Sequence, residues 1–165
     1  IALTAPELTA SCDAGAAIRT LDALSHELPT HTVRSEDQIA YQQFSTPPAL
    51  AILAIQLARL TSDDVFLEPS AGTGIIAALA RPHVGKSLLN ELEPTRAEIL
   101  EGLFPQVSVT RHDGAKISAL LAADPRPSVI VMNPPFSVMA NVSGRMADAA
   151  ARHVASALAR LADGR

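Results

Sequence analysis

Four short polar motifs in the sequence hold residues that could bind a ligand or take part in a reaction. They read EPSAGTG at 68–74, NELEP at 90–94, RHDG at 111–114 and NPPF at 133–136, and each follows a β-rich run. Ligands of open parallel sheets bind at the carboxyl ends of the strands. If the runs before the motifs are parallel strands, all four motifs lie at one edge of one sheet.

The first two motifs fit a ligand that carries an anionic group and a ribose. Gly72 and Gly74 would stand between a strand and an apolar helix, where free N–H groups and the helix dipole favour an anion, here a carboxylate. Glu91 follows them at about the interval expected of an acid that binds ribose hydroxyls. Two ordinary explanations stay open: a tight turn whose glycines only relieve strain, and an acidic helix N-terminus formed by Glu91 and Glu93.

The third motif offers a carboxylate, Asp113, that could accept a hydrogen bond from an adenine amino group. A surface turn built on Asp and Gly would explain it equally well. We assign the neighbouring His112 to the turn or the surface, because no second catalytic partner is evident in the sequence.

The fourth motif is the most specific of the set, because its residue types suit chemistry at an amino nitrogen conjugated to a ring or a carbonyl. Such a nitrogen is a poor nucleophile, and two acceptors aimed at its N–H groups would favour the pyramidal geometry that frees the lone pair for a methyl group. Asn133 can supply a side-chain oxygen and Pro134 its carbonyl. Pro134 and Pro135 stiffen the loop, and Phe136 offers a face for stacking a planar group. An ordinary proline-rich strand exit is the alternative.

The alternation of β-rich runs and helical stretches predicts an α/β fold with a parallel sheet and right-handed crossovers. We expect strands at Val65–Glu68, Lys86–Asn90, Val107–Thr110 and Ser128–Met132. We expect helices at about Ala49–Leu60, Gly74–Ala80, Pro94–Leu103, Ala115–Ala122 and Arg145–Leu161. The stretch Leu3–Leu28 predicts one or two packing helices. We divide the chain into an N-terminal helical segment, 1–45, and a sheet-containing domain, 46–165.

The composition limits what the chain can do alone. Its 165 residues, 48% of them hydrophobic, suffice for one core, but a net charge of −4 lacks the basic excess of a self-sufficient nucleic-acid binder. The single Cys12 and the absence of zinc-type spacing predict no disulfide, no metal and a reducing, cytoplasmic setting. The most hydrophobic window, Ala49–Leu60, is too short to span a bilayer. Because no signal peptide is visible and the first residue is Ile1, we expect a piece of a longer protein.

The four motifs, preceded by QFSTP at 43–47, resemble those of class I amino-methyltransferases of the adenine-N6 type. More closely, LPTHTVRSEDQIAYQQFSTP, VFLEPSAGTG, VTRHDGAKI, VIVMNPPFS and RHVASALARLADGR are similar to the methyltransferase region of bacterial strawberry-notch-like methylase/helicase proteins. The resemblance runs from about Leu28 to the end. It implies a Rossmann-like fold and S-adenosylmethionine as cofactor.

The resemblance also implies roles for the motif residues. Its cofactor-binding set is Thr46, Pro47, Glu68, Ser70, Gly72 and Gly74 near the methionine moiety, Glu91 at the ribose, Asp113 at the adenine amino group, and Leu92 next to Glu91. Its catalytic set, which would hold the target base, is Asn133, Pro134, Pro135 and Phe136.

The activity implied by this resemblance is methyl transfer to an exocyclic amino nitrogen, with adenine N6 in DNA as the first candidate and the target base flipped out of its helix. The same NPPF chemistry also serves the amide of a protein glutamine and the N2 amino group of guanine in RNA. A non-catalytic module that binds cofactor or partner beside a helicase is the third alternative. The expected partner is nucleic acid, DNA in preference to RNA, contacted through regions outside this chain.

One expectation concerns the edge of the sheet. The family's sheet has seven strands, and this sequence stops where a fifth would begin, so the domain would be partial and inactive alone. Strand 128–132 would then pair with 65–68 on one side only. We expect Val129, Ile130 and Val131 to form an exposed apolar edge that could associate with a second copy.

Overall fold

A four-stranded parallel sheet forms the centre of the molecule. The computed structural model describes residues 14–27, 45–135 and 146–163. Its strands are β1 (Val65–Glu68), β2 (Lys86–Asn90), β3 (Val109–Thr110) and β4 (Val129–Ile130), in the spatial order β3-β2-β1-β4. All three strand pairs are parallel. The predicted α/β fold with a parallel sheet is therefore confirmed.

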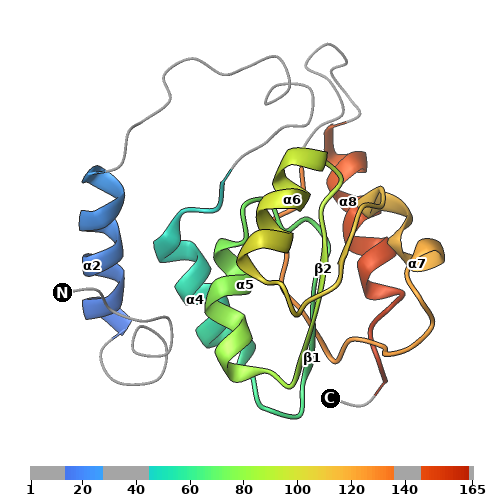
Figure 1. Ribbon diagram of the computed structural model, residues 1–165, viewed down its shortest axis with the longest axis horizontal. Helices are drawn as coiled ribbons and strands as arrows, with labels where there is room; N and C mark the ends of the chain where they lie inside the picture. Colours follow the sequence, from blue (N-terminus) through green and yellow to red (C-terminus); the bar gives the residue numbers. More distant parts are fainter. Residues whose placement is uncertain (1–13, 28–44, 136–145, 164–165) are drawn as a thin grey trace.

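Helices cover both faces of this sheet. They are α2 (Ala14–Glu27), α4 (Pro48–Ala58), α5 (Ile75–Ala80), α6 (Pro94–Leu103), α7 (Ile117–Leu120) and α8 (Met146–Leu158), with 3₁₀ turns η1 (Arg81–His83) and η2 (Gly114–Lys116). Figure 1 shows α4 and α5 on one side of the sheet and α7 and α8 on the other. The helix α2 lies beside α4, and Ile18 of α2 packs against the core. The remaining residues of the expected Leu3–Leu28 helices lie outside the described residues.

The sequence predicted some elements more closely than others. The strands β1 and β2 and the helix α6 have the expected bounds, whereas β3 and β4 are shorter than expected. The expected helix 115–122 is a 3₁₀ turn followed by one helical turn, because Asp113 caps η2 and the chain becomes extended again at Leu121. The division into units 1–45 and 46–165 stays a prediction.

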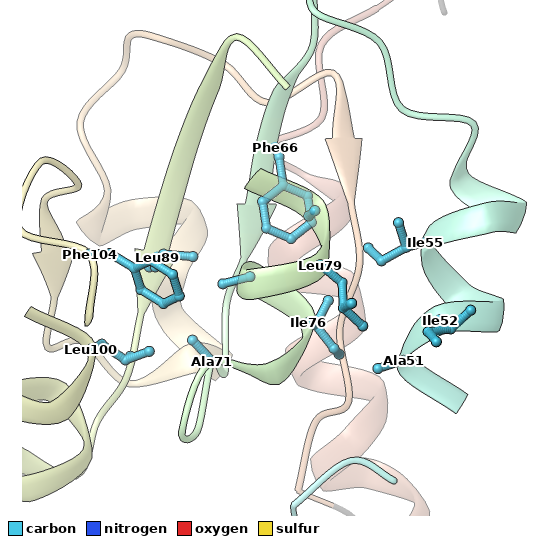
Figure 2. Packing of buried hydrophobic residues seen from close by; sticks show 12 residues of the cluster. Ala51, Ile52, Ile55, Phe66, Ala71, Ile76, Leu79, Leu89, Leu100 and Phe104 are labelled. Atoms are coloured by element: carbon cyan, nitrogen blue, oxygen red, sulfur yellow. The ribbon is translucent and has the colours of Figure 1, made fainter. Parts of the chain in front are cut away.

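The main core lies between the sheet and the helices α4, α5 and α6. Ala51 and Ile52 of α4 are fully buried there, and Phe66 of β1 is too. Figure 2 shows Ile52 and Ile55 on one side of Ile76 and Leu79, and Leu89, Leu100 and Phe104 on the other side of the cluster. Burying such side chains is the main stabilising term of a fold. This packing fixes α4, and with it the segment just before α4, against the sheet.

Polar contacts fix β4 next to β1 at the start of both strands. Asp64 accepts a hydrogen bond from the Ser128 hydroxyl at 2.7 Å, and Ser128 accepts one from the Val65 N–H at 3.1 Å. Asp64 is only 4% exposed, so these bonds are shielded from water. The two strands therefore leave the sheet side by side at their carboxyl ends.

The outer edge of β4 differs in one respect from the expectation. β4 pairs with β1 and is the last strand of the described sheet, as predicted. Its apolar side chains are not exposed, however: Val129 is 8% exposed, and Ile130 and Val131 are partly buried. Strand side chains point toward the helix-covered faces of a sheet, so an edge exposes backbone groups rather than side chains. Self-association through this edge stays a prediction.

Among the described residues, no helix is both long enough and apolar enough to cross a membrane.

Candidate functional site

The strand ends bring the predicted motifs to one edge of the sheet. The strands β1, β2, β3 and β4 are parallel, so the segments after Glu68, Asn90, Thr110 and Ile130 leave the sheet at the same side. Hydrogen bonds join the segments after β1, β2 and β3 directly. This is the edge at which parallel α/β sheets bind ligands.

The glycine turn after β1 is bound to the end of β2. The Ala71 N–H donates to the Asn90 carbonyl at 2.9 Å. Gly72 and Gly74 have φ angles of 57° and 87°, which side chains other than glycine adopt only with strain. A Cβ at Gly72 would meet only Arg96 Nη1, at 3.5 Å, so the turn stays open on that side.

Gly74 has a packing role. It is buried, and a Cβ there would lie 2.8 Å from Leu100 Cδ2 and 2.9 Å from Phe104 Cε2. The absence of a side chain therefore lets α5 start close against α6. The contact of Gly74 with cofactor stays a prediction.

The two acids after β2 have different partners. Glu91 Oε2 accepts from the Gly72 N–H at 2.7 Å, and its Oε1 accepts from the Glu93 N–H at 2.9 Å. Glu93 instead caps α6, accepting from the N–H groups of Thr95 and Arg96. Burial raises the pKa of Glu93, but these hydrogen bonds outweigh it and hold the pKa below its ordinary value. Glu93 therefore caps the N-terminus of α6, while Glu91 faces the glycine turn.

A cation lies beside this turn. Burial lowers the pKa of Arg96 from its ordinary value, and the charges of Glu91 and Glu93 act in the opposite direction. Its guanidinium lies close to Gly72. No sequence pattern singles out Arg96, because its proximity to the turn depends on how α6 packs.

Glu68 is a buried acid with an unpaired oxygen. The residue is 2% exposed, and its Oε2 has no hydrogen-bond partner within the described part of the chain. Burial raises the pKa of Glu68 well above its ordinary value; a hydrogen bond from the Ala77 N–H lowers it, and the charge of Glu91 raises it further. Such an acid is stabilised by a cationic or hydrogen-bonding ligand.

The segment after β3 presents Asp113 at a 3₁₀ turn. Its Oδ1 accepts from the Ala115 N–H at 3.0 Å, and its Oδ2 lies 3.3 Å from Lys116 Nζ. Burial raises the pKa of Asp113, but these contacts and the His153 ring together lower it below its ordinary value. Next to it, Gly114 packs against His153 of α8, since a Cβ would lie 2.7 Å from the ring. The carboxyl group of Asp113 is therefore ionised at neutral pH. Its side chain is 40% exposed.

Sequence reasoning missed the residue that joins these segments, Asn90. It is 1% exposed, and its Nδ2 donates to the carbonyls of Pro69 and His112 at 3.0 and 2.9 Å. Its Oδ1 accepts from the Thr110 hydroxyl at 2.8 Å and the His112 N–H at 2.9 Å. All four hydrogen-bonding positions of the amide are thus used. The only available signal was a polar residue at the end of the apolar strand KSLLN.

The structure joins two distant motifs after β4. Asn133 Nδ2 donates to Thr46 Oγ1 at 3.1 Å, across 87 residues of sequence. Pro134 and Pro135 are partly buried beside them. Phe136, the fourth residue of the motif, lies outside the described residues.

The other predicted site residues take simpler positions. Ser70 is partly buried in the glycine turn, Pro47 precedes α4 as its N-cap, and Leu92 is 47% exposed directly after Glu91. Within residues 14–27, 45–135 and 146–163, no group of His, Cys, Asp and Glu side chains could hold a metal ion.

No protein-family model matches the sequence. A curated relative, ribosomal RNA small subunit methyltransferase A of Thermobifida fusca (strain YX), is 29% identical over 105 residues. The match covers 59% of this chain and 36% of that protein, so the chain spans little more than a third of the relative's length.

Solved structures share the architecture. A candidate RNA methyltransferase from Pyrococcus horikoshii superposes with a TM-score of 0.63 at 18% identity, over 87% of this chain and 69% of that one. A candidate methyltransferase from Streptococcus mutans, solved in complex with SAH (S-adenosylhomocysteine), superposes with a TM-score of 0.52 at 12% identity, over 73% and 69% of the two chains. The strand order, the helices on both faces and these likenesses together show that the chain has the Rossmann-like fold of class I S-adenosylmethionine-dependent methyltransferases.

Proposed function

We propose that this domain transfers a methyl group from S-adenosylmethionine to an exocyclic amino nitrogen of a nucleobase, adenine N6 in DNA. Two contacts at the carboxyl ends of the parallel strands carry the proposal. Glu91, after β2, accepts a hydrogen bond from the glycine turn, and Asn133, after β4, donates one to Thr46. By the sequence resemblance, the domain works as one part of a larger methylase/helicase protein.

The residues at the ends of β1, β2 and β3 fit the cofactor. Each Glu91 oxygen accepts one backbone hydrogen bond and keeps a second lone pair for a ribose hydroxyl. Leu92 exposes an apolar face beside it, and the unpaired oxygen of Glu68 favours a cationic ligand. S-adenosylmethionine supplies an electrophilic methyl group on a positively charged sulfur. The SAH-bound neighbour and the methyltransferase relative support this assignment.

The residues after β4 suit an amino group as methyl acceptor. The hydrogen bond to Thr46 uses the amide nitrogen of Asn133, which leaves the amide oxygen to accept an N–H of the acceptor. The Pro134 carbonyl supplies the second acceptor. Both interactions strengthen as the nitrogen becomes pyramidal, so they lower the barrier rather than only binding the substrate.

RNA is the second candidate substrate, and a specific observation favours it. The curated relative is named for ribosomal RNA, and the Pyrococcus horikoshii neighbour is described as an RNA methyltransferase. DNA is supported by the adenine-N6 motif set. In both cases the net charge of −4 leaves most phosphate contacts to other parts of the protein.

Incubation of the full-length protein with methyl-labelled S-adenosylmethionine tests the proposal. Separate reactions receive adenine-containing DNA, RNA of the same sequence, or protein extract, and the products are hydrolysed and separated. Label in N6-methyladenine from DNA supports the first candidate, and label in RNA replaces it with the second. Label confined to protein glutamine, or no transfer to any acceptor, overturns the proposal.

A further inference from the structure

The hydrogen bond between Thr46 and Asn133 connects two elements that are each fixed independently. Thr46 lies two residues before α4, whose Ala51 and Ile52 are fully buried in the core. Asn133 lies three residues after β4, which pairs with β1. Both side chains are partly buried, so water competes only in part for the bond between them. The two atoms therefore meet because of the fold, and not through local chain flexibility.

The bond has a consequence for the direction in which the Asn133 amide points. The oxygen and the NH₂ of an amide are alike in size, so shape alone does not decide which of them faces the site. An amide turned the wrong way would set its NH₂ against the acceptor amino group, donor against donor. Thr46 Oγ1 accepts from Nδ2, and this directs Oδ1 away from Thr46.

A threonine hydroxyl can donate as well as accept, so its role depends on where its own proton goes. While Thr46 accepts from Asn133, its O–H is left to donate to another group. The carboxylate of S-adenosylmethionine is a group of the required kind, and chains of hydrogen bonds strengthen one another. Cofactor binding would then hold the hydroxyl in the state that orients Asn133.

We propose that Thr46 is a positioning residue for Asn133: its oxygen fixes the amide so that Oδ1 faces the acceptor amino group, and bound cofactor reinforces that arrangement. The proposal rests on the proposed function and adds to it a coupling between the cofactor side and the acceptor side. Thr46 acts here through Asn133, in addition to any contact of its own with the cofactor.

The variants Thr46→Val and Thr46→Ser in the full-length protein separate this role from simple cofactor binding. Valine has nearly the shape of threonine but cannot accept a hydrogen bond, whereas serine keeps the hydroxyl. At saturating S-adenosylmethionine we expect Thr46→Val to lower kcat by about ten- to a hundredfold, the scale of a misplaced catalytic group. Thr46→Ser should restore kcat to within about threefold of the wild type. Thr20→Val, which removes a hydroxyl that donates to the Ala16 carbonyl of its own helix, should leave kcat unchanged.

Two outcomes would overturn the inference while leaving the proposed function in place. A Thr46→Val enzyme with wild-type kcat and only a higher KM for S-adenosylmethionine would show that Thr46 serves the cofactor alone. Equal losses in Thr46→Val and Thr46→Ser would point to packing and not to the hydroxyl. Failure of the wild type to bind cofactor or transfer methyl would instead count against the proposed function.

A readout that needs no turnover tests the hydrogen bond itself. In nuclear magnetic resonance spectra of ¹⁵N-labelled protein, the side-chain NH₂ signals of Asn133 should shift on addition of S-adenosylhomocysteine. The shift should persist in Thr46→Ser and vanish in Thr46→Val, where exchange of these protons with water should also be faster. Asn133 signals that behave identically in all three proteins would refute the positioning role.

Discussion

The cofactor side and the acceptor side of the site are constructed differently. After β1, β2 and β3, the turns are joined through backbone groups: Glu91 holds Gly72, and Asn90 holds the carbonyls of Pro69 and His112. After β4, Asn133 is held by a side chain from a segment 87 residues away. A site whose groups are fixed before the ligand arrives binds it at lower entropic cost. We infer that several contacts to backbone groups organise the segments after β1, β2 and β3, and that the segment after β4 depends on a single bond between side chains.

The largest expected effect comes from removing Asn90, because this residue holds the cofactor side together. Asn90→Ala should lower the free energy of unfolding by at least about 3 kcal/mol, since several buried groups lose their partners and each unpaired one costs about 1–3 kcal/mol. Urea denaturation measures this change. Ser108→Ala, a change at an exposed serine next to β3, is the control. A loss below about 1 kcal/mol would mean that water replaces the amide, and the contrast between the two sides would weaken.

Glu91→Gln should weaken the cofactor side without unfolding it. The variant loses the charge that binds the Gly72 N–H and would bind the ribose, so we expect S-adenosylmethionine affinity to fall by about ten- to a hundredfold, or about 1.5–3 kcal/mol. Isothermal titration calorimetry gives the affinity directly. The control is Glu98→Gln, at an exposed position of α6. Equal affinities for Glu91→Gln and wild type would remove the ribose assignment.

Two glycines of the same region allow a matched comparison of stability. Gly74→Ala should destabilise the protein by about 1–3 kcal/mol, because the Cβ meets Leu100 and Phe104 at a φ of 87°. Gly102→Ala, in α6, meets nothing within 4 Å and should stabilise by about 0.5–1 kcal/mol. Thermal unfolding should therefore move in opposite directions for the two variants. Movement in the same direction would contradict the packing role of Gly74.

The smallest expected effect is a dependence of stability on pH at Asp113. Its pKa is lower in the folded protein than in the unfolded chain, so it stabilises the fold above its unfolded pKa of about 3.9, and this contribution is lost as pH falls through the lower folded value. Asp113→Asn should remove that part of the acid sensitivity. The change should stay below about 1 kcal/mol, because the pair with Lys116 is largely exposed to solvent. The free energy of unfolding is measured as a function of pH for both variants, with Asp63→Asn, at an exposed position, as the control. An Asp113→Asn protein with the same acid sensitivity as the wild type would contradict the prediction.

The sequence predicted the elements where local signals are strong. The start of α6 follows from Pro94 at the first helical position, and β1 and β2 follow from short runs that end in apolar residues and one polar residue. The β3 and β4 strands are shorter, since their ends depend on pairing with a neighbour and not on their own residues. The sequence also placed the four motifs at one sheet edge, which the structure confirms.

The contacts that organise the site could not be predicted in the same way. Pro94 marks Glu93 as the residue before α6, but no local pattern shows that Glu91 accepts the Gly72 N–H, because this contact depends on how β2 lies beside the glycine turn. Asn90 and the bond between Thr46 and Asn133 depend on strand order and register, which no local pattern records. Sequence patterns therefore predicted which motifs follow the strands, whereas the hydrogen bonds between these motifs required the fold.

If different strand ends serve the cofactor and the methyl acceptor, Asn133→Ala should separate turnover from cofactor binding. Turnover of the full-length variant is measured at saturating S-adenosylmethionine, with its affinity for the cofactor determined in parallel. We expect turnover to fall by about 10²–10³-fold or more, the usual cost of losing a hydrogen-bonding group that acts in the transition state, while cofactor affinity stays within about twofold. Wild-type turnover in Asn133→Ala, or a loss of cofactor affinity that accounts for the whole defect, would contradict the claim.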